Sequence, residues 1–410
     1  MTLFPALERV NLTSPQEVRI MTITALAPVS SAQLDGVHLE FRSVLRAFVR
    51  DQVLPLVDES EKSKSFPKQL WSKLAGLGVL GIGLPEHSGG TGDADSVSMM
   101  IFAEELSKAS GGIAITPLAS SYLGGPYLAK FGTPDQQKTY LEPMIAGKMV
   151  AAIAITEPGA GSDVAGISSV ARKVEGGYRI SGSKIFITNG GIADWLIVAA
   201  KTDPTERHKG ISQFIVLPSD LGFSVGRPLE KLGWHSSDTR ELRFDDCFVP
   251  DDRLVGEVGR GFYQIASAFQ TERLVLCGMA LGHAQVCLDL SLEYAKQRVA
   301  FGHTIGKFQA IRHQLAQMAI DLKTSRLLAL DAAHKLDAHA HDSLEVVSMA
   351  KYHCCRVANT IADHAMQVFG GMGYLEETKI ALHFRDARIL RIGGGTDEIM
   401  LEVVAKQMGL

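Results

Sequence analysis

Residues 156–163 read Thr-Glu-Pro-Gly-Ala-Gly-Ser-Asp and directly follow the apolar run at 150–155. Glycines let backbone N–H groups come close to a bound molecule, and Thr156 and Ser162 add hydroxyl donors. The stretch lacks the Gly-Lys-Ser/Thr ending of a phosphate-binding loop and the spacing of a dinucleotide-binding fingerprint. It indicates either a loop that a flat ligand approaches closely or a surface turn.

A second cluster of this kind lies at 184–191, which reads Lys-Ile-Phe-Ile-Thr-Asn-Gly-Gly. Its Asn-Gly pair ends an expected strand and by itself predicts a hairpin turn. In the same region as the first cluster, it offers an aromatic ring and a hydroxyl to a second side of a planar cofactor.

Around these clusters the sequence pattern changes from helix to strand and back to helix. Apolar residues after position 39 recur with the helical period. Residues 151–250 carry short β-prone runs separated by turn residues, two of them at 178–180 and 184–188. After Gly261 the strand signals vanish, and glycines near 301–306 and 369–374 divide long helical stretches into about four helices. The strand-rich part suggests a small antiparallel sheet or barrel.

The composition excludes several classes of protein. Of the 410 residues, 46% are hydrophobic and 21% charged, and the net charge of -4 gives no sign of a nucleic-acid partner. Apolar runs fall short of the ~18 residues of a membrane span. Five cysteines without a C-x-x-C pattern indicate neither disulfides nor a metal site, and we expect a cytoplasmic location. Residues 1–31 stay unassigned, with Met1 or Met21 as the start.

In chain order, a series of segments resembles the motifs of the acyl-CoA dehydrogenase flavoprotein family, over about residues 39–410. The order of the segments is far more specific than any one of them. The segments are TEPGAGSD at 156–163, KIFITNGG at 184–191, SSDTREL at 236–242, RVAFG at 298–302, QVFGGMGY at 367–374, RDARI at 385–389 and GGTDEI at 394–399.

The resemblance implies an α+β fold of three parts and FAD as the cofactor. The expected parts are an N-terminal helical domain at 32–150, a middle antiparallel β-barrel-like domain at 151–260 and a C-terminal four-helix bundle at 261–410, as in the family. It also implies a homotetramer, or a homodimer, with FAD held between subunits. An electron-transfer flavoprotein is the expected electron acceptor.

The FAD contacts of the family carry over to two groups of residues, some of them on the FAD of a neighbouring subunit. The flavin ring and its ribityl side are expected against Ile153, Ala154, Ile155, Thr156, Gly161, Ser162, Phe186, Ile187 and Thr188. The adenine and pyrophosphate are expected against Arg298, Gln309, Gln367, Val368, Phe369, Gly370, Gly371, Thr396, Asp397 and Glu398. An arginine suits a pyrophosphate because its planar fork donates to oxygens in pairs.

The chemistry of the family removes a proton α to a thioester carbonyl while a hydride leaves the β carbon for the flavin N5. The reaction needs a desolvated carboxylate as the base. Members carry it either just before the C-terminal Gly-Thr or on the first helix of the C-terminal domain. The first position is Gly394 here, which has no side chain. The second is Glu272, as in isovaleryl-CoA and long-chain acyl-CoA dehydrogenases, so Glu272 is the expected base.

Because neighbours on a helix point ~100° apart, a salt bridge between Glu272 and Arg273 is not expected. Members use the backbone N–H at the position of Gly394, with a flavin ribityl hydroxyl, to bind the thioester oxygen. Glycines at 393–395 leave space for short or branched acyl groups. The expected substrate contacts are Ser162, Ser181, Gly182, Tyr263, Gln270, Arg273, Gly394 and Gly395.

The leading hypothesis is an FAD-dependent enzyme that converts an acyl-CoA to a trans-2-enoyl-CoA. His235 stands where members commonly carry an arginine, which leaves open a dehydrogenase of acyl or aminoacyl groups on a carrier protein. A flavin oxidase or monooxygenase is a further alternative, although Glu272 argues against it. A flavoprotein without enzymatic activity is the last alternative, since a fold can outlast its chemistry.

Overall fold

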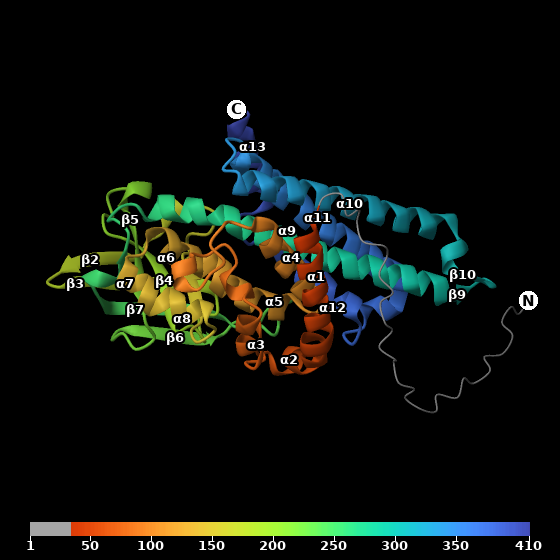
Figure 1. The fold of residues 1–410 in the computed structure, drawn as a ribbon, viewed down its shortest axis with the longest axis horizontal. Coiled ribbons are helices and arrows are strands. Elements are labelled where there is room, and N and C mark those ends of the chain that lie inside the picture. Colours follow the sequence, from red (N-terminus) through yellow and green to blue (C-terminus); the bar gives the residue numbers. More distant parts are fainter. Residues whose placement is uncertain (1–33) are drawn as a thin grey trace, which may run out of the picture.

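The computed structural model describes residues 34–410 of the protein (Figure 1). Helices form the first part, a sheet the middle part and further helices the last part, so the α+β order predicted from the sequence is correct. The sheet lies at one end of the molecule, and the long C-terminal helices extend away from it. The expected extension at 1–31, and the choice between Met1 and Met21, lie outside the described residues.

Among the N-terminal helices, α4 is the central one: every residue in it is buried, and it packs against α1, α5 and the C-terminal helices α9 and α10. The Asp35 carboxylate caps α1 by accepting a hydrogen bond from the backbone N–H of His38 at 2.9 Å. The helices are α1 (Gly36–Phe48), α2 (Val57–Ser63), α3 (Leu70–Gly76), α4 (Ser96–Ser107), α5 (Gly111–Leu118), α6 (Gly125–Phe131), α7 (Pro134–Gln136) and α8 (Glu142–Ile145).

A π-helical turn, Ala119–Gly124, joins α5 to α6 where both face the sheet and the C-terminal helices. Pro117 and Pro126 flank it, and because proline has no N–H, the regular helical hydrogen bonds cannot continue through this segment. The Ser120 hydroxyl in this turn accepts a hydrogen bond from the N–H of Ala151 at 2.9 Å. The turn therefore fixes the start of the first strand.

The sheet runs in the order β6-β7-β3-β2-β4-β5-β8, and β1 pairs with β4. It is mostly antiparallel, but β4 pairs in parallel with β1 and at one position with β2. The sequence pattern had suggested antiparallel pairing only. The two strands expected near 178–180 and 184–188 are one long strand, β3, with two register shifts. The strands are β1 (Ala151–Ala154), β2 (Val170–Val174), β3 (Gly177–Thr188), β4 (Trp195–Lys201), β5 (Ile211–Val216), β6 (Phe223–Pro228), β7 (Thr239–Pro250) and β8 (Leu254–Val255).

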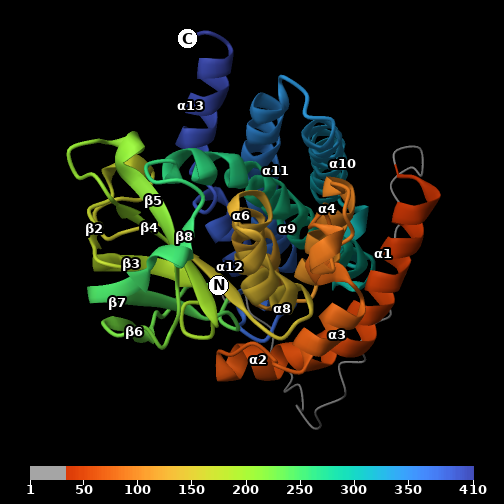
Figure 2. The same cartoon turned by 60° about the vertical axis from the view of Figure 1, so that its left-hand side comes forward.

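The C-terminal part consists of three long helices and two shorter ones. Helix α9 begins beside the sheet and runs through the middle of the molecule, with α10 and α11 packed along it (Figures 1 and 2). A break at 338–342 separates α10 from α11, and the sequence of this break contains no glycine. The helices are α9 (Gly261–Gln297), α10 (Gln309–Asp337), α11 (Ser343–Phe369), α12 (Lys379–Arg388) and α13 (Asp397–Gln407), and the hairpin of β9 (Val299–Ala300) and β10 (His303–Thr304) follows α9.

By length and composition α9 is long and apolar enough to cross a membrane, although the uninterrupted apolar runs considered in the sequence are shorter. However, 83% of its most apolar window is buried inside the protein. Its apolar residues pack against the neighbouring helices and form the largest hydrophobic core. Burial among helices therefore accounts for the composition of α9.

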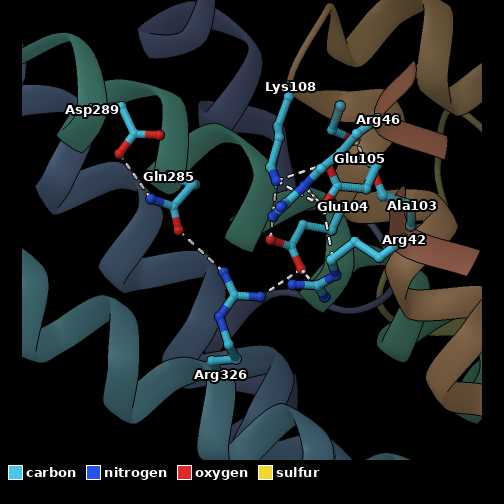
Figure 3. Close-up of polar contacts among 10 residues, drawn as sticks. Arg42, Arg46, Ala103, Glu104, Glu105, Lys108, Gln285, Asp289 and Arg326 are labelled. Atoms are coloured by element: carbon cyan, nitrogen blue, oxygen red, sulfur yellow. Dashed lines mark hydrogen bonds and ion pairs between the residues drawn. The ribbon is translucent and has the colours of Figure 1, made fainter. Parts of the chain in front are cut away.

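Figure 3 shows a buried polar network that joins α1, α4 and α10. The Glu104 carboxylate, 1% exposed, accepts hydrogen bonds from Arg42 at 2.9 Å and from Arg326 at 2.5 Å. Lys108 lies 3.6 Å from the same carboxylate. These cations hold the pKa of Glu104 well below its usual value although burial alone would raise it. The network satisfies charges that would be costly to bury alone.

Asp386 on α12 joins the three parts of the chain. Its carboxylate accepts hydrogen bonds from the backbone N–H groups of Gly111, at the start of α5, and of Trp234, in the loop before β7, at 2.9 and 2.7 Å. Burial, with a contribution from Glu61, raises the pKa of Asp386 to about 7. The RDARI segment thus has a structural role here.

Candidate active site

Glu272 on α9 faces the glycine segment 393–395, which precedes α13. A Cβ atom built on Gly394 would lie 3.5 Å from Oε1 of Glu272 and 2.6 Å from Cδ1 of Leu276. Gly394 and Gly395 have φ angles of +64° and +101°, which disfavour residues with side chains. The segment can therefore pass close to α9 only because it has no side chains at these positions.

The Glu272 side chain carries a carboxyl group suited to act as a base. Burial raises the pKa of Glu272 to about 7, while the positive charges of Arg273 and Lys351 oppose this rise. Arg273 makes no ion pair with Glu272 among the described residues, because its guanidinium donates to the Gly394 carbonyl at 3.4 Å and to the Ser348 hydroxyl at 3.3 Å. The two neighbours point different ways, as expected.

Two residues missed from the sequence also belong to this site. Leu276 packs where a side chain on Gly394 would stand, and Lys351 on α11 donates a hydrogen bond to the Gly395 carbonyl. Lys351 is buried, 0% exposed, among the apolar residues of its helix. The sequence offered one signal for Lys351: it lies three and four residues before Cys354 and Cys355, within an apolar stripe of a predicted helix.

The first group of expected FAD residues lies on and directly after β1 and at the end of β3. The N–H of Ile185 donates to the carbonyl of Thr156 at 2.9 Å, so the two glycine-rich clusters lie side by side. The Phe186 side chain is 66% exposed, with a φ of +61° at that residue, and Ser162 is also exposed. An open aromatic face beside hydroxyls and backbone groups fits the flat ring of FAD.

A buried ion pair joins the two glycine-rich clusters. The Lys184 ammonium donates to the Glu157 carboxylate at 2.7 Å and to the Ile155 carbonyl at 3.0 Å. The same carboxylate accepts hydrogen bonds from the N–H groups of Ser168 and Ser169. Although burial alone would raise it, Lys184 and these serines lower the pKa of Glu157 to about 2, and burial lowers the pKa of Lys184 to about 8.

Most of the second group of expected FAD residues lies at the far end of α9. Arg298 caps the C-terminus of α9, Gln309 begins α10, and 367–371 end α11. The rings of Tyr294 and Phe369 stack there at 4.2 Å and hold the two helix ends together. At ~1.5 Å per residue, Arg298 lies about 39 Å from Glu272 along α9. This part of the second group is thus far from Glu272 within one chain.

The remaining expected FAD residues begin α13. The Thr396 hydroxyl caps the helix by accepting from the N–H of Ile399 at 3.4 Å, and Glu398 is exposed. Asp397 differs, because its buried carboxylate is paired with Arg391 at 2.7 Å. The negative charge of Asp397 is therefore balanced by Arg391 of the same chain.

The expected substrate residues outside the glycine segment lie mainly on the first half of α9 and on β3. Tyr263 is 41% exposed and stacks beneath the Arg260 guanidinium at 4.6 Å, so it is not a core tyrosine. Gly182 has a φ of +147°, and a Cβ there would lie 2.3 Å from the Ser169 hydroxyl. Ser181 is exposed beside it, and Gln270 accepts a hydrogen bond from the Ser343 hydroxyl at 3.4 Å.

Comparison with known proteins gives the family. Residues 36–148, 152–247 and 259–409 match the N-terminal, middle and C-terminal domains of acyl-CoA dehydrogenases. The chain belongs to the acyl-CoA dehydrogenase family. It is 38% identical to mitochondrial isovaleryl-CoA dehydrogenase from Arabidopsis thaliana over 381 residues, covering 92% of this chain and 93% of that protein.

Two solved structures extend this similarity to the fold. An acyl-CoA dehydrogenase from Geobacillus kaustophilus has a TM-score of 0.89 and 38% identity, covering 93% of this chain and 100% of that one. PigA, solved with FAD and proline, has a TM-score of 0.89 and 29% identity, covering 93% and 100%.

As an acyl-CoA dehydrogenase, the protein is an oxidoreductase with FAD as its cofactor. The exposed ring of Phe186, with Thr156 nearby, fits the flavin ring of FAD. The glycine segment and Glu272 lie together on the C-terminal helices. The chemistry available at this second place is the transfer of a proton to a carboxylate beside the backbone of the glycine segment.

Proposed function

We propose that the protein oxidises an acyl-CoA thioester to a trans-2-enoyl-CoA, with Glu272 as the catalytic base. The observation that carries this proposal is the position of the Glu272 carboxyl group beside the Gly394 backbone. A base at this place can reach the carbon next to a carbonyl that binds to the Gly394 N–H.

In the proposed reaction, the Gly394 N–H donates a hydrogen bond to the thioester oxygen and stabilises the charge that develops there. Glu272 accepts the proton from the α carbon. When bound, FAD supplies the acceptor for the β hydrogen, which leaves as a hydride to N5. The pKa of about 7 that burial gives Glu272 suits a base that works near neutral pH.

We propose that each FAD contacts two copies of the chain. The flavin ring lies against Ile155, Thr156 and Phe186 of one copy. The adenine half lies against the group at Arg298 and 367–371 of another copy, because about 39 Å along α9 separates this group from Glu272. A homotetramer or a homodimer meets this requirement.

The proposed substrates are short or branched acyl-CoA esters. The similarity to an isovaleryl-CoA dehydrogenase supports this class. The glycines at 394 and 395 do not add the space expected from the sequence, because Leu276 and Met400 each lie 2.6 Å from where a Cβ atom would stand. An electron-transfer flavoprotein is the proposed electron acceptor. The cytoplasmic location expected from the sequence stays a prediction.

The test is anaerobic mixing of the FAD-loaded protein with short, branched, long and aromatic acyl-CoA esters, followed by the loss of oxidised-flavin absorbance. We expect bleaching by short or branched esters and a loss of about 10²–10⁴-fold in its rate in Glu272→Gln. Glu402→Gln, on the exposed face of α13, is the matched control and should bleach like the wild type. Equal rates in Glu272→Gln and the wild type would disprove the role of Glu272.

The similarity to PigA, whose structure contains proline, favours one second candidate. In it, the protein acts on an acyl or aminoacyl group tethered to a carrier protein, with the same base. Bleaching by a carrier-bound thioester, and none by any CoA ester, would select this candidate.

A further inference from the structure

A buried lysine stands behind the glycine segment. Lys351 on α11 is 0% exposed and donates a hydrogen bond to the carbonyl of Gly395. It takes part in no ion pair within residues 34–410, unlike the other fully buried lysine, Lys184, which is paired with Glu157. Burying an ammonium without a carboxylate partner costs free energy, so this position calls for an explanation.

The segment that Lys351 contacts would bind the substrate carbonyl. Arg273 holds the carbonyl of Gly394, and Lys351 holds the carbonyl of the next residue. Both residues are glycines, so their backbone torsions are freer than those of other residues. The Gly394 N–H belongs to the peptide group just before these two carbonyls, and cations on the carbonyls of Gly394 and Gly395 fix the two peptide groups that follow it, which limits how far the Gly394 backbone can turn.

Further contacts from α11 and α13 support the glycine segment. Ser348, one turn before Lys351, accepts a hydrogen bond from Arg273, so one face of α11 supports both cations. Thr396 begins α13 directly after the segment and anchors its other end. The segment is therefore held from α9, α11 and α13.

We propose that Lys351 is a positioning residue for the dehydrogenation. It holds the Gly395 carbonyl and so keeps the glycine segment in the position from which the Gly394 N–H can reach the thioester oxygen, and its charge favours the ionised Glu272 and the enolate-like substrate. This inference rests on the proposed function.

The charges around Glu272 support this electrostatic role. Arg273 on the same helix and Lys351 on α11 lower the pKa of Glu272, and Glu272 raises the pKa of the buried Tyr127 on α6. Burial lowers the pKa of Lys351 itself, while Cys355, Asp397, Cys277 and Glu272 raise it. Loss of the Lys351 charge should therefore raise the pKa of Glu272.

The decisive variant is Lys351→Met, which keeps the length of the side chain and removes its charge and donors. We expect kcat to fall by about ten- to a hundredfold with little change in KM, because the loss concerns the transition state. The pH at which kcat/KM is half-maximal should move up by about one unit, on the scale of pKa shifts caused by a neighbouring charge. Amide hydrogen exchange at 393–396 should become faster than in the wild type.

Cys354→Ala is the matched control, because Cys354 is buried on the same helix and contacts the Ser325 carbonyl, away from the glycine segment. It should lower the melting temperature and leave the pH profile unchanged. Lys351→Gln, which keeps a donor but no charge, should restore slow exchange and retain the shifted pH profile, and it replaces Lys351→Met if that variant does not fold.

A wild-type pH profile and wild-type hydrogen exchange in Lys351→Met would overturn the inference. Failure of the wild-type protein to be reduced by any thioester would instead contradict the proposed function. In that case, the exchange at 393–396 still tests whether Lys351 holds the segment.

Discussion

Glu272 on α9 and Gly394 before α13, the two positions at which the family resemblance predicts a base, lie side by side in this protein. Oε1 of Glu272 lies 3.5 Å from the position of a Cβ on Gly394. Leu276 fills the space that the side chain at 394 would need. A carboxylate on α9 or on the glycine segment would reach the same place, but Leu276 leaves room in this chain only for the carboxylate on α9.

The first prediction concerns the pH dependence of the reaction. Because burial raises the pKa of Glu272 to about 7, the base is protonated and inactive below this pH. We expect kcat/KM for an acyl-CoA ester to rise with pH through about 7 and then to level off. Steady-state kinetics from pH 5.5 to 8.5, at constant FAD content, measure this. A rate that falls over this range would contradict the assignment.

The second prediction is that Gly394→Ala damages both stability and activity. Its Cβ would stand 2.6 Å from Leu276, at a φ of +64°. We expect a loss of about 1–3 kcal/mol in the free energy of unfolding. Gly176→Ala is the control, because Gly176 has a φ of +71° with nothing within 4 Å of its Cβ position. Leu276→Ala should relieve part of the loss in Gly394→Ala, and no relief would show that Leu276 is not its cause.

The third prediction concerns the network around Glu104. Glu104→Gln leaves the buried Arg42 and Arg326 without their shared negative charge. We expect a loss of about 3–5 kcal/mol in the free energy of unfolding, measured by chemical denaturation. Glu40→Gln, at an exposed position of α1, should change it by less than about 0.5 kcal/mol. Equal stability of the two variants would refute the role of the network.

The fourth prediction concerns stability in acid. Nδ1 of His283 lies 2.8 Å from Nδ1 of His383, and both rings are fully buried. Burial lowers the pKa of His283 to about 3, so the folded state keeps this ring neutral while the unfolded state takes up a proton below about 6.5. The stability that neutral His283 contributes is present above about pH 6.5 and is lost as the pH falls, by about 2 kcal/mol at pH 5.

Replacing both rings, as in His283→Leu with His383→Leu, should flatten the dependence of unfolding free energy on pH between 4 and 6.5. His313→Leu, at an exposed position of α10, should leave that dependence as in the wild type. An unchanged slope in the double variant would count against the buried pair as its origin.

The sequence by itself determined the order of helices, strands and helices, because hydrophobic periodicity and turn residues are local signals. It also singled out Glu272 and the glycines at 393–395 through family motifs. It divided β3 into two strands at 181–183, because Ser-Gly-Ser there resembles a turn and the register of the strand shifts between Ile180 and Gly182. It missed the break at 338–342, which no glycine or proline marks.

Only the tertiary structure decided which distant residues meet. Gly394 lies against Leu276, and Lys351 reaches the carbonyl of Gly395, across helices that are far apart in the chain. The pKa of Glu272 also depends on this packing, because burial is a property of the assembled core. Sequence patterns report what each segment prefers, whereas contacts between segments arise only when their apolar faces pack together.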